Sequence, residues 1–157
     1  MKHMLKLTTP SDLEIVMTRD FSAPRRLVFD AWTKPELIRR WHGVFGGWTM
    51  AICEFEARPG GNYQFVWQGP GGASMRMSGV VREIVAPERI VATERFNDEP
   101  DEILSTLELV ERGGLTSLTN TVLCPTKELR DAILATPMEQ GVAAGYDTLD
   151  GVLASML

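Results

Sequence analysis

The middle of the chain is a series of short segments rich in β-forming residues, and turns containing glycine or proline separate them. The connections are too short to contain crossover helices, so neighbouring strands must run antiparallel. This pattern restricts the centre of the molecule to a meandering antiparallel sheet. We expect its strands near residues 48–56, 62–68, 74–85, 88–96, 102–111 and 115–123.

One more strand and two short helices precede the meander. Apolar and polar residues alternate over residues 13–21, which is the period of a half-buried strand. After Ser22-Ala23-Pro24 the apolar residues take helical spacing as far as Trp32. The run Thr33-Lys34-Pro35-Glu36 resembles a capping box, so we expect a second short helix that reaches Trp41.

The end of the chain has helical periodicity. We expect one helix over residues 127–135 and another over residues 138–156, because Thr136-Pro137-Met138-Glu139 combines a cap, a first-turn proline and a capping-box glutamate. The apolar face of the last helix consists of Met138, Val142, Tyr146, Leu149, Leu153 and Met156. Such a face must be covered. The element order therefore predicts an α+β fold: a curved antiparallel sheet of about six or seven strands, two short helices, and a long C-terminal helix over the concave face.

Length and charge narrow the function classes. The 157 residues suffice for one domain, which we place at residues 13–157 after an N-terminal extension of residues 1–12. Sixteen Lys and Arg against 21 Asp and Glu give a net charge of −5, so the basic surface needed for nucleic acid is missing. No segment has the apolar length of a signal peptide or a membrane span. We expect a cytoplasmic protein that does not insert into membranes.

The sequence lacks the motifs of metal, cofactor and nucleophilic chemistry. Cys53 and Cys124 form no CxxC pair, and the only histidines are His3 and His42. The spacings of phosphate-binding loops, zinc proteases and serine hydrolases do not occur. We expect no metal and no cofactor, and whether the protein is an enzyme stays open, with the balance toward a non-enzyme.

Segments along nearly the whole chain resemble one protein family. They are Arg19-Asp20-Phe21-Ser22-Ala23-Pro24, Val28-Phe29-Asp30-Ala31-Trp32-Thr33-Lys34-Pro35-Glu36, Trp41, Arg58-Pro59-Gly60-Gly61, Gly79, Pro87-Glu88-Arg89-Ile90, Thr116, and Met138 to Leu153 with Gly141 before Tyr146. The pattern resembles the SRPBCC superfamily of START-like or birch-pollen-allergen-like helix-grip proteins, and within it the homologues of the activator of the heat-shock-protein ATPase. The resemblance implies a helix-grip fold. Its members include lipid carriers, hormone receptors, cyclases and oxygenase domains.

Aromatic and methionine residues are candidates to line a cavity in such a fold. Tyr63, Phe65 and Trp67 share one face of a predicted strand, while Met75 and Met77 share one face of the next. A set of this kind is often plain core. The flexible thioethers of methionine also suit an adaptable apolar binding surface.

The helices contribute the other candidates. Met138, Val142 and Tyr146 lie on the inward face of the last helix. The family resemblance places Trp41 and His42 at the mouth of the cavity. His42 could serve as a general base or a polar ligand contact, or it could interact only with the last carbonyls of its helix.

Asn120 is the polar residue that the pattern places most clearly on the concave face. It lies between inward-facing aliphatic residues, and a buried amide without a partner costs about 1 to 3 kcal/mol. We expect the Asn120 amide to be satisfied by a neighbour such as Tyr146, by a water or by a ligand, or else by an internal hydrogen bond. Arg19 and Glu94 are weaker candidates for inward polar groups.

Three function classes stay open. The first and favoured one is a binding module that takes a small apolar or amphipathic ligand into the cavity. The second is an enzyme of cyclase, dehydratase or hydrolase type that uses the same cavity. The third is an interaction protein with a chaperone as its partner. Exposed strand edges also allow a homodimer.

Overall fold

The computed structural model describes residues 3–157 and has an α+β fold with one eight-stranded antiparallel sheet. The sheet order is β1-β2-β8-β7-β6-β5-β4-β3. The strands are β1 (Lys6–Thr8), β2 (Glu14–Phe21), β3 (Thr49–Phe55), β4 (Asn62–Gln68), β5 (Ser74–Val85), β6 (Arg89–Phe96), β7 (Ile103–Arg112) and β8 (Leu115–Leu123). The helices are α1 (Arg25–Thr33), α2 (Pro35–Ile38), α3 (Lys127–Leu134) and α4 (Met138–Met156), with a 3-10 turn η1 (Pro70–Gly72).

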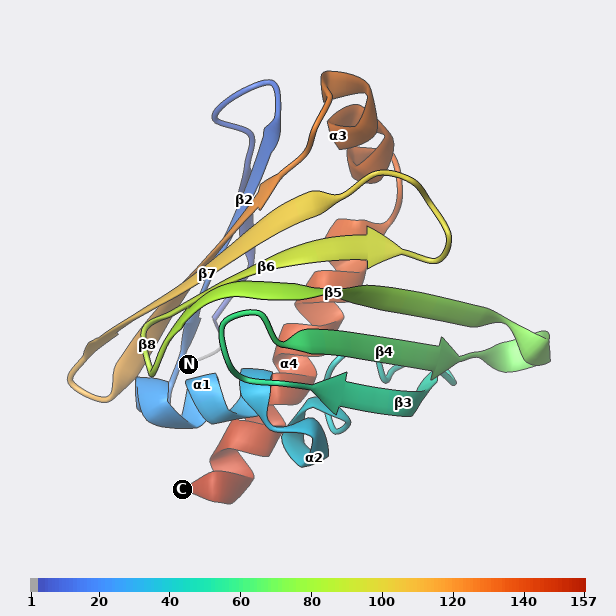
Figure 1. The fold of residues 1–157 in the computed structure, drawn as a ribbon. Helices are drawn as coiled ribbons and strands as arrows, with labels where there is room; N and C mark the ends of the chain where they lie inside the picture. The colour runs from blue at the N-terminus through green and yellow to red at the C-terminus, as the bar shows by residue number, and fades with distance from the viewer. Residues whose placement is uncertain (1–2) are drawn as a thin grey trace.

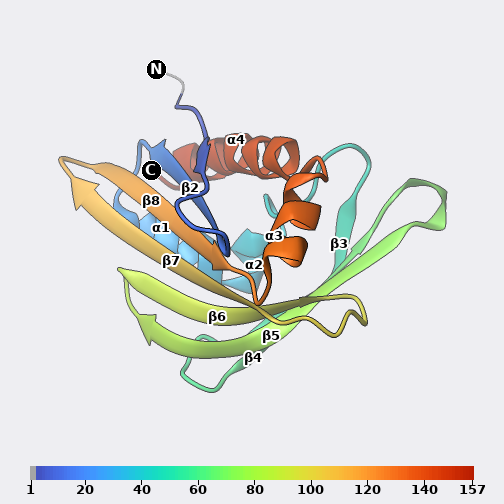
Figure 2. The ribbon, with the colours of Figure 1, turned by 90° about the horizontal axis from the view of Figure 1, so that it is seen from above.

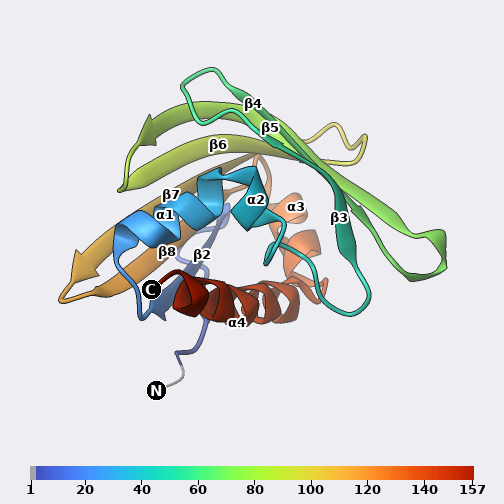
Figure 3. The ribbon, with the colours of Figure 1, turned by 90° about the horizontal axis from the view of Figure 1, so that it is seen from below.

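The sheet is strongly curved, and α4 crosses its concave side (Figures 1 and 2). Seen from below, the strands arch over α1 and α2 while α4 runs across the open side of the arch (Figure 3). Irregular pairing between Val81 and Glu83 in β5, and between Met50 and Ile52 in β3, marks bulges of the kind that bend strands. The curvature leaves room for side chains from both the sheet and α4.

Close contact between strands also requires glycine at one point of the bend. A Cβ atom on Gly79 of β5 would lie 1.9 Å from the backbone oxygen of Thr93 in β6 and 2.7 Å from the ring of Tyr63. The Tyr63 hydroxyl donates a hydrogen bond of 2.5 Å to that same oxygen. The side chain of Tyr63 thus reaches across the backbone of β5, which only a residue without a side chain permits.

The structure confirms the predicted fold class, with eight strands in place of six or seven. The additional strand is β1, whose residues Lys6, Leu7 and Thr8 pair with β2. Three residues are too few for an alternating pattern to emerge, so this strand had no sequence signal. It lies within the segment predicted as an extension, of which Met1 and Lys2 are outside the described residues.

The predicted capping boxes are wrong at both sites. The Thr33 hydroxyl donates to the carbonyl of Phe29 at 3.0 Å, and α2 begins after Lys34 and ends at Ile38, before Trp41. The Thr136 hydroxyl donates to a carbonyl of the preceding turn at 2.6 Å, and Pro137 is the N-cap of α4. Both hydroxyls bond back to carbonyls of the preceding helix, three or four residues earlier, and therefore do not cap the helix that follows.

The apolar face predicted for the last helix packs as expected in its C-terminal half. Leu149 and Leu153 are buried with Phe21 of β2 and Leu118 of β8 in the largest core cluster. At the N-terminal end of α4, Met138 and Val142 of this apolar face are only partly buried. The helix therefore seals one end of the fold and leaves space at the other.

Candidate functional site

A cavity of about 860 Å³, called the chamber below, lies between the concave face of the sheet and the N-terminal half of α4. Every strand except β1, and all four α-helices, contribute to its wall. All of the residues predicted as cavity candidates line it, namely Trp41, His42, Tyr63, Phe65, Trp67, Met75, Met77, Asn120, Met138, Val142 and Tyr146. Their roles in binding stay predictions.

An aromatic cluster forms one wall. The His42 ring stacks on Trp41 with centroids 5.0 Å apart and an interplanar angle of 20°, and it meets the rings of Phe65 and Trp67 edge-on at 5.4 Å. The Trp41 indole donates to the carbonyl of Ala31 at 2.9 Å, while the Trp67 indole donates to the His42 carbonyl at 2.8 Å. These hydrogen bonds fix the two indoles, so the wall is preorganised.

His42 is a packed, neutral ring. Burial among the aromatic side chains lowers its pKa from 6.5 to about 4, since the site penalises the charged imidazolium. Its backbone N–H donates to the Ile38 carbonyl, as expected for a residue that follows a short helix, but the ring itself faces the chamber. At neutral pH the ring offers aromatic surface and an uncharged nitrogen.

A polar row crosses the otherwise apolar floor of the chamber. It consists of Glu94 on β6, Ser105 on β7 and Asn120 on β8, which are neighbours because these strands are adjacent. The Asn120 amide donates to the Ser105 hydroxyl at 2.9 Å and to the carbonyl of Thr106 at 3.2 Å. The internal hydrogen bond expected for Asn120 is present, but its partner is Ser105 and the suggestion of Tyr146 was wrong.

Glu94 is the titratable group of this row. Burial raises the pKa of its carboxyl from 4.5 to about 7, and a hydrogen bond with Ser105 offsets part of that rise. Glu94 is half-buried, and it lines the chamber together with Ile90 and Ala92 of the same strand. The inward face of β6 is therefore the one that carries Ile90, Ala92 and Glu94, which the sequence pattern left undecided.

Tyr146 of α4 lines the chamber opposite the sheet that carries Glu94. Its side chain is 3% exposed and meets Phe21 edge-on at 5.6 Å. Burial and the charge of Glu94 both raise the pKa of its hydroxyl. Within residues 3–157 that hydroxyl forms no side-chain or backbone hydrogen bond. It is thus a buried polar group still able to bond to a guest.

The exposed members of the lining mark the mouth of the chamber. Phe45 in the loop after α2 is 41% exposed, and Met75 at the start of β5 is 36% exposed. Glu99 and Asp101 in the β6–β7 loop, and Pro137 at the α3–α4 corner, are also exposed while lining the chamber. The opening therefore lies between these loops, at the N-terminal end of α4.

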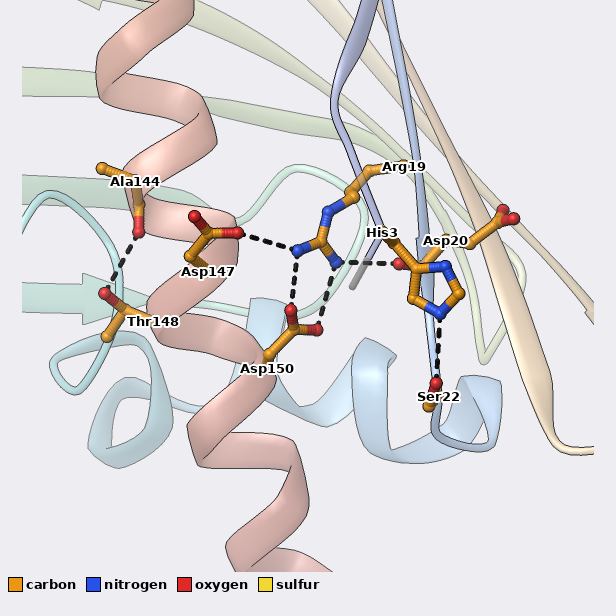
Figure 4. Close-up of polar contacts among 8 residues, drawn as sticks. All are labelled: His3, Arg19, Asp20, Ser22, Ala144, Asp147, Thr148 and Asp150. Carbon is orange, nitrogen blue, oxygen red and sulfur yellow. Dashed lines mark hydrogen bonds and ion pairs between the residues drawn. The ribbon is translucent and has the colours of Figure 1, made fainter. Parts of the chain in front are cut away.

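Arg19 attaches the covering helix to the sheet. It is 3% exposed, and its guanidinium contacts Asp150 at 2.6 and 3.1 Å and Asp147 at 3.0 Å, both on α4 (Figure 4). It also donates to the Asp20 carbonyl at 2.8 Å and lies 4.8 Å from the ring centroid of Phe21. Burial opposes the charge of Arg19, but the two carboxylates outweigh it and raise its pKa. Arg19, which the sequence offered as a weaker candidate for an inward polar group, therefore holds α4 in position.

A second depression, of about 430 Å³, lies on the outer face of the sheet around Glu56, Arg95 and Glu102. Glu56, Arg95 and Glu102 are engaged in ion pairs, namely Arg58–Glu56 at 3.0 Å and Arg95–Glu102 at 3.6 Å. The chamber is larger and more enclosed, and it gathers the aromatic cluster and the polar row. We therefore take the chamber as the candidate site.

Sequence reasoning missed several members of the lining, of which Ser105 matters most. Ser105 shares one strand face with Ile103 and Leu107, so a lone hydroxyl among inward apolar positions was the available signal. Among the described residues, no group of three or more His, Cys, Asp or Glu side chains could hold a metal ion. No helix within residues 3–157 is both long enough and apolar enough to cross a bilayer.

Comparison with known proteins places these features in a wider group. The family model described as "Activator of Hsp90 ATPase homolog 1-like protein" matches residues 22–154. A solved protein from Rhodobacter sphaeroides is 32% identical with a TM-score of 0.91, and the match covers 97% of this chain and 99% of that one. One from Staphylococcus epidermidis is 26% identical with a TM-score of 0.81, covering 97% of this chain and 95% of that one. No curated protein matches the chain in sequence.

Proposed function

The chain belongs to the family of Activator of Hsp90 ATPase homolog 1-like proteins, and from this membership and the chamber we propose that it binds a small apolar or amphipathic molecule. The match confirms the family resemblance drawn from the sequence. At the general level, membership supports a ligand-binding or an interaction protein. The chamber favours the first of these.

The observation that carries the proposal is the size and chemistry of the chamber. A volume of about 860 Å³ falls within the range of small-molecule sites, which is about 300 to 1,000 Å³. Such sites combine apolar walls with a few polar groups that orient the ligand. The aromatic cluster around Trp41 and Trp67 supplies the walls, and Glu94, Asn120 and Tyr146 supply the polar groups.

A fluorescent neutral amphiphile tests the proposal. We expect 1-pyrenemethanol to bind with a stoichiometry of one and to raise the melting temperature, since a ligand that binds only the folded state stabilises it. Val142 lines the chamber from α4, so Val142→Trp should fill the space and weaken binding by about tenfold or more. Gln140→Trp, on an exposed position of the same helix, is the matched control and should bind as the parent does.

Two outcomes would count against a binding chamber. One is the absence of saturable binding of 1-pyrenemethanol by a folded, monodisperse protein. The other is equal affinity of the Val142→Trp and parent proteins, which would place the probe outside the chamber. Circular dichroism of both tryptophan variants verifies that each has the parent fold.

One observation favours an enzyme that uses the same chamber. A carboxyl with a pKa of about 7, as burial gives Glu94, suits a general acid or base at neutral pH. The Ser105 hydroxyl beside it could relay a proton. A β-hydroxyketone on an aromatic body is a suitable test substrate. If the protein is a dehydratase, the parent should release the enone and Glu94→Gln should not, although both bind the substrate.

A further inference from the structure

We propose that the chamber selects molecules carrying a protonated amine on an apolar body, and that the ammonium group lies against Glu94. This inference rests on the binding function proposed above and names the class of its ligand. It follows from three features of the lining: the sign of its charges, the unused bonding capacity of its polar groups, and its aromatic surface.

All charged side chains that line the chamber are carboxylates. They are Glu94 within it and Glu99 and Asp101 at its mouth, and the described part of the lining includes no lysine or arginine. A cleft lined by one sign of charge attracts ligands of the opposite sign. The basic group whose charge reaches Tyr146 is Arg19, and the carboxylates of α4 already engage its guanidinium. A cationic ligand therefore meets no competing cation in the wall.

The polar groups inside the chamber can still accept hydrogen bonds. The Glu94 carboxylate interacts with Ser105 and forms no ion pair with residues 3–157, so most of its lone pairs are free. The Tyr146 hydroxyl, 3% exposed, is also without a hydrogen-bond partner in the described chain. An ammonium group has three N–H donors, and the two groups together offer it a carboxylate and a hydroxyl oxygen.

The apolar wall suits a cation better than an anion. The rings of Trp41, Trp67 and Phe65 line the chamber, and the negative side of an aromatic quadrupole attracts a nearby positive charge. A carboxylate ligand would instead lie in a site of low polarity beside Glu94, where like charges repel. The same chamber should therefore discriminate between amphiphiles that differ only in the charge of the head group.

Affinity for an amine should depend on pH through Glu94. The titratable groups around it are Tyr63 from β4, Tyr146 from α4 and Cys124 after β8, whose pKa values are all raised. The ring of His42 is neutral above its pKa of about 4, and Glu99 and Asp101 stand at the mouth. Glu94, with a pKa of about 7, must be ionised to pair with an ammonium group. Binding of the amine should thus weaken as the pH falls below 7.

Three pyrene probes of matched shape provide the test: 1-pyrenemethylamine, 1-pyrenemethanol and 1-pyreneacetic acid, titrated by fluorescence anisotropy. At pH 8 we expect the amine to bind about tenfold or more tightly than the alcohol, because both head groups can donate a hydrogen bond to the Glu94 carboxylate but only the ammonium group also forms an ion pair with it. The acid should bind more weakly than the alcohol. At pH 5.5 the preference for the amine should shrink while the alcohol binds unchanged.

Glu94→Gln keeps the shape of the side chain and should abolish the preference for the amine. Glu54→Gln is the control, because Glu54 is exposed on β3 outside the chamber and the substitution changes the net charge equally. If Glu94→Gln fails to fold, the pH dependence of the parent protein gives the same test.

The outcomes separate this inference from the function on which it rests. Equal affinities for amine and alcohol, or a preference that survives Glu94→Gln, would overturn the amine assignment and leave the binding function standing. If none of the three probes binds, both proposals fail. A preference lost equally in Glu54→Gln would show a general effect of net charge and would also overturn the assignment to Glu94.

Discussion

Arg19 of β2 and Asp150 of α4 form a two-point ion pair, with N–O distances of 2.6 and 3.1 Å, although 131 positions separate them in the sequence. The guanidinium is almost fully buried, while the carboxylate is partly exposed. The contact joins the strand next to the sheet edge to the helix that covers the chamber (Figure 4). It is thus one of the contacts that hold α4 against the sheet.

Removing one partner of this pair should destabilise the fold. Asp150→Ala leaves a buried guanidinium with a single carboxylate contact, and we expect a loss of about 1 to 3 kcal/mol of unfolding free energy. Urea denaturation measures it. Asp98→Ala is the control: Asp98 pairs with Arg76 but its side chain is 97% exposed, so its loss should cost less than about 1 kcal/mol. Equal losses in the two variants would contradict a structural role for Arg19.

Glu94 should make the protein more stable as the pH falls from 8 to 5.5. Its pKa is about 7 in the folded chain against an ordinary value of 4.5, so between these values the folded state binds the extra proton. The stabilisation is complete below about pH 4.5, and it is lost as the pH rises from there to about 7. Because Glu94 is half-buried, we expect a gain of about 1 to 2 kcal/mol. Glu94→Gln should lack it, and an identical pH profile for variant and parent would contradict the assignment.

His42 should act in the opposite direction. Its pKa is about 4 in the folded chain and 6.5 ordinarily, so the unfolded state binds the extra proton between these values. Stability from the neutral ring is complete above pH 6.5 and is lost as the pH falls toward 4. His42→Phe keeps an aromatic ring and should reduce the loss between pH 7 and 5 by about 2 kcal/mol. Since the two groups oppose each other, each variant must be compared with the parent at every pH.

Two glycines should respond oppositely to alanine. At Gly79 a methyl group would lie 1.9 Å from the Thr93 oxygen, so Gly79→Ala must displace β5 from β6 and should cost several kcal/mol, on the order of 3. At Gly151, in α4, a methyl group meets nothing within 4 Å, so Gly151→Ala should stabilise the helix by about 0.5 to 1 kcal/mol. Thermal unfolding of both proteins checks the pair. A neutral Gly79→Ala would contradict the close contact of the two strands.

The alternation and helical spacing of apolar residues predicted the elements that position the site. The alternation along the strand assigned Tyr63, Phe65 and Trp67 to one face of β4, and all three line the chamber. Alternation is informative because a half-buried strand exposes one face only. It is weaker for β6, where Val91 and Thr93 are buried on the outer side as well, so Glu94 could not be assigned to a face from the pattern.

Features that depend on contacts between distant segments had no local signal. The pair of Arg19 with Asp150 and the hydrogen bond of Asn120 with Ser105 both join residues whose sequence neighbours reveal nothing about the partner. The capping motifs failed for a related reason: Thr33 and Thr136 each have a preceding helix whose carbonyls accept their hydroxyls. The volume of the chamber depends on how far α4 stands from the sheet, which many such contacts decide together.

The methionines allow the most direct test of the central claim that the chamber receives a guest. Met77 and Met138 line it, whereas Met50 is buried outside it and Met4 is 77% exposed. In protein labelled with ¹³C at the methionine methyl groups, saturating 1-pyrenemethanol should shift the signals of Met77 and Met138 through the ring current of pyrene. The signals of Met50 and Met4 should stay in place. Unshifted signals for Met77 and Met138 under saturating probe, or shifts confined to Met4, would contradict the account.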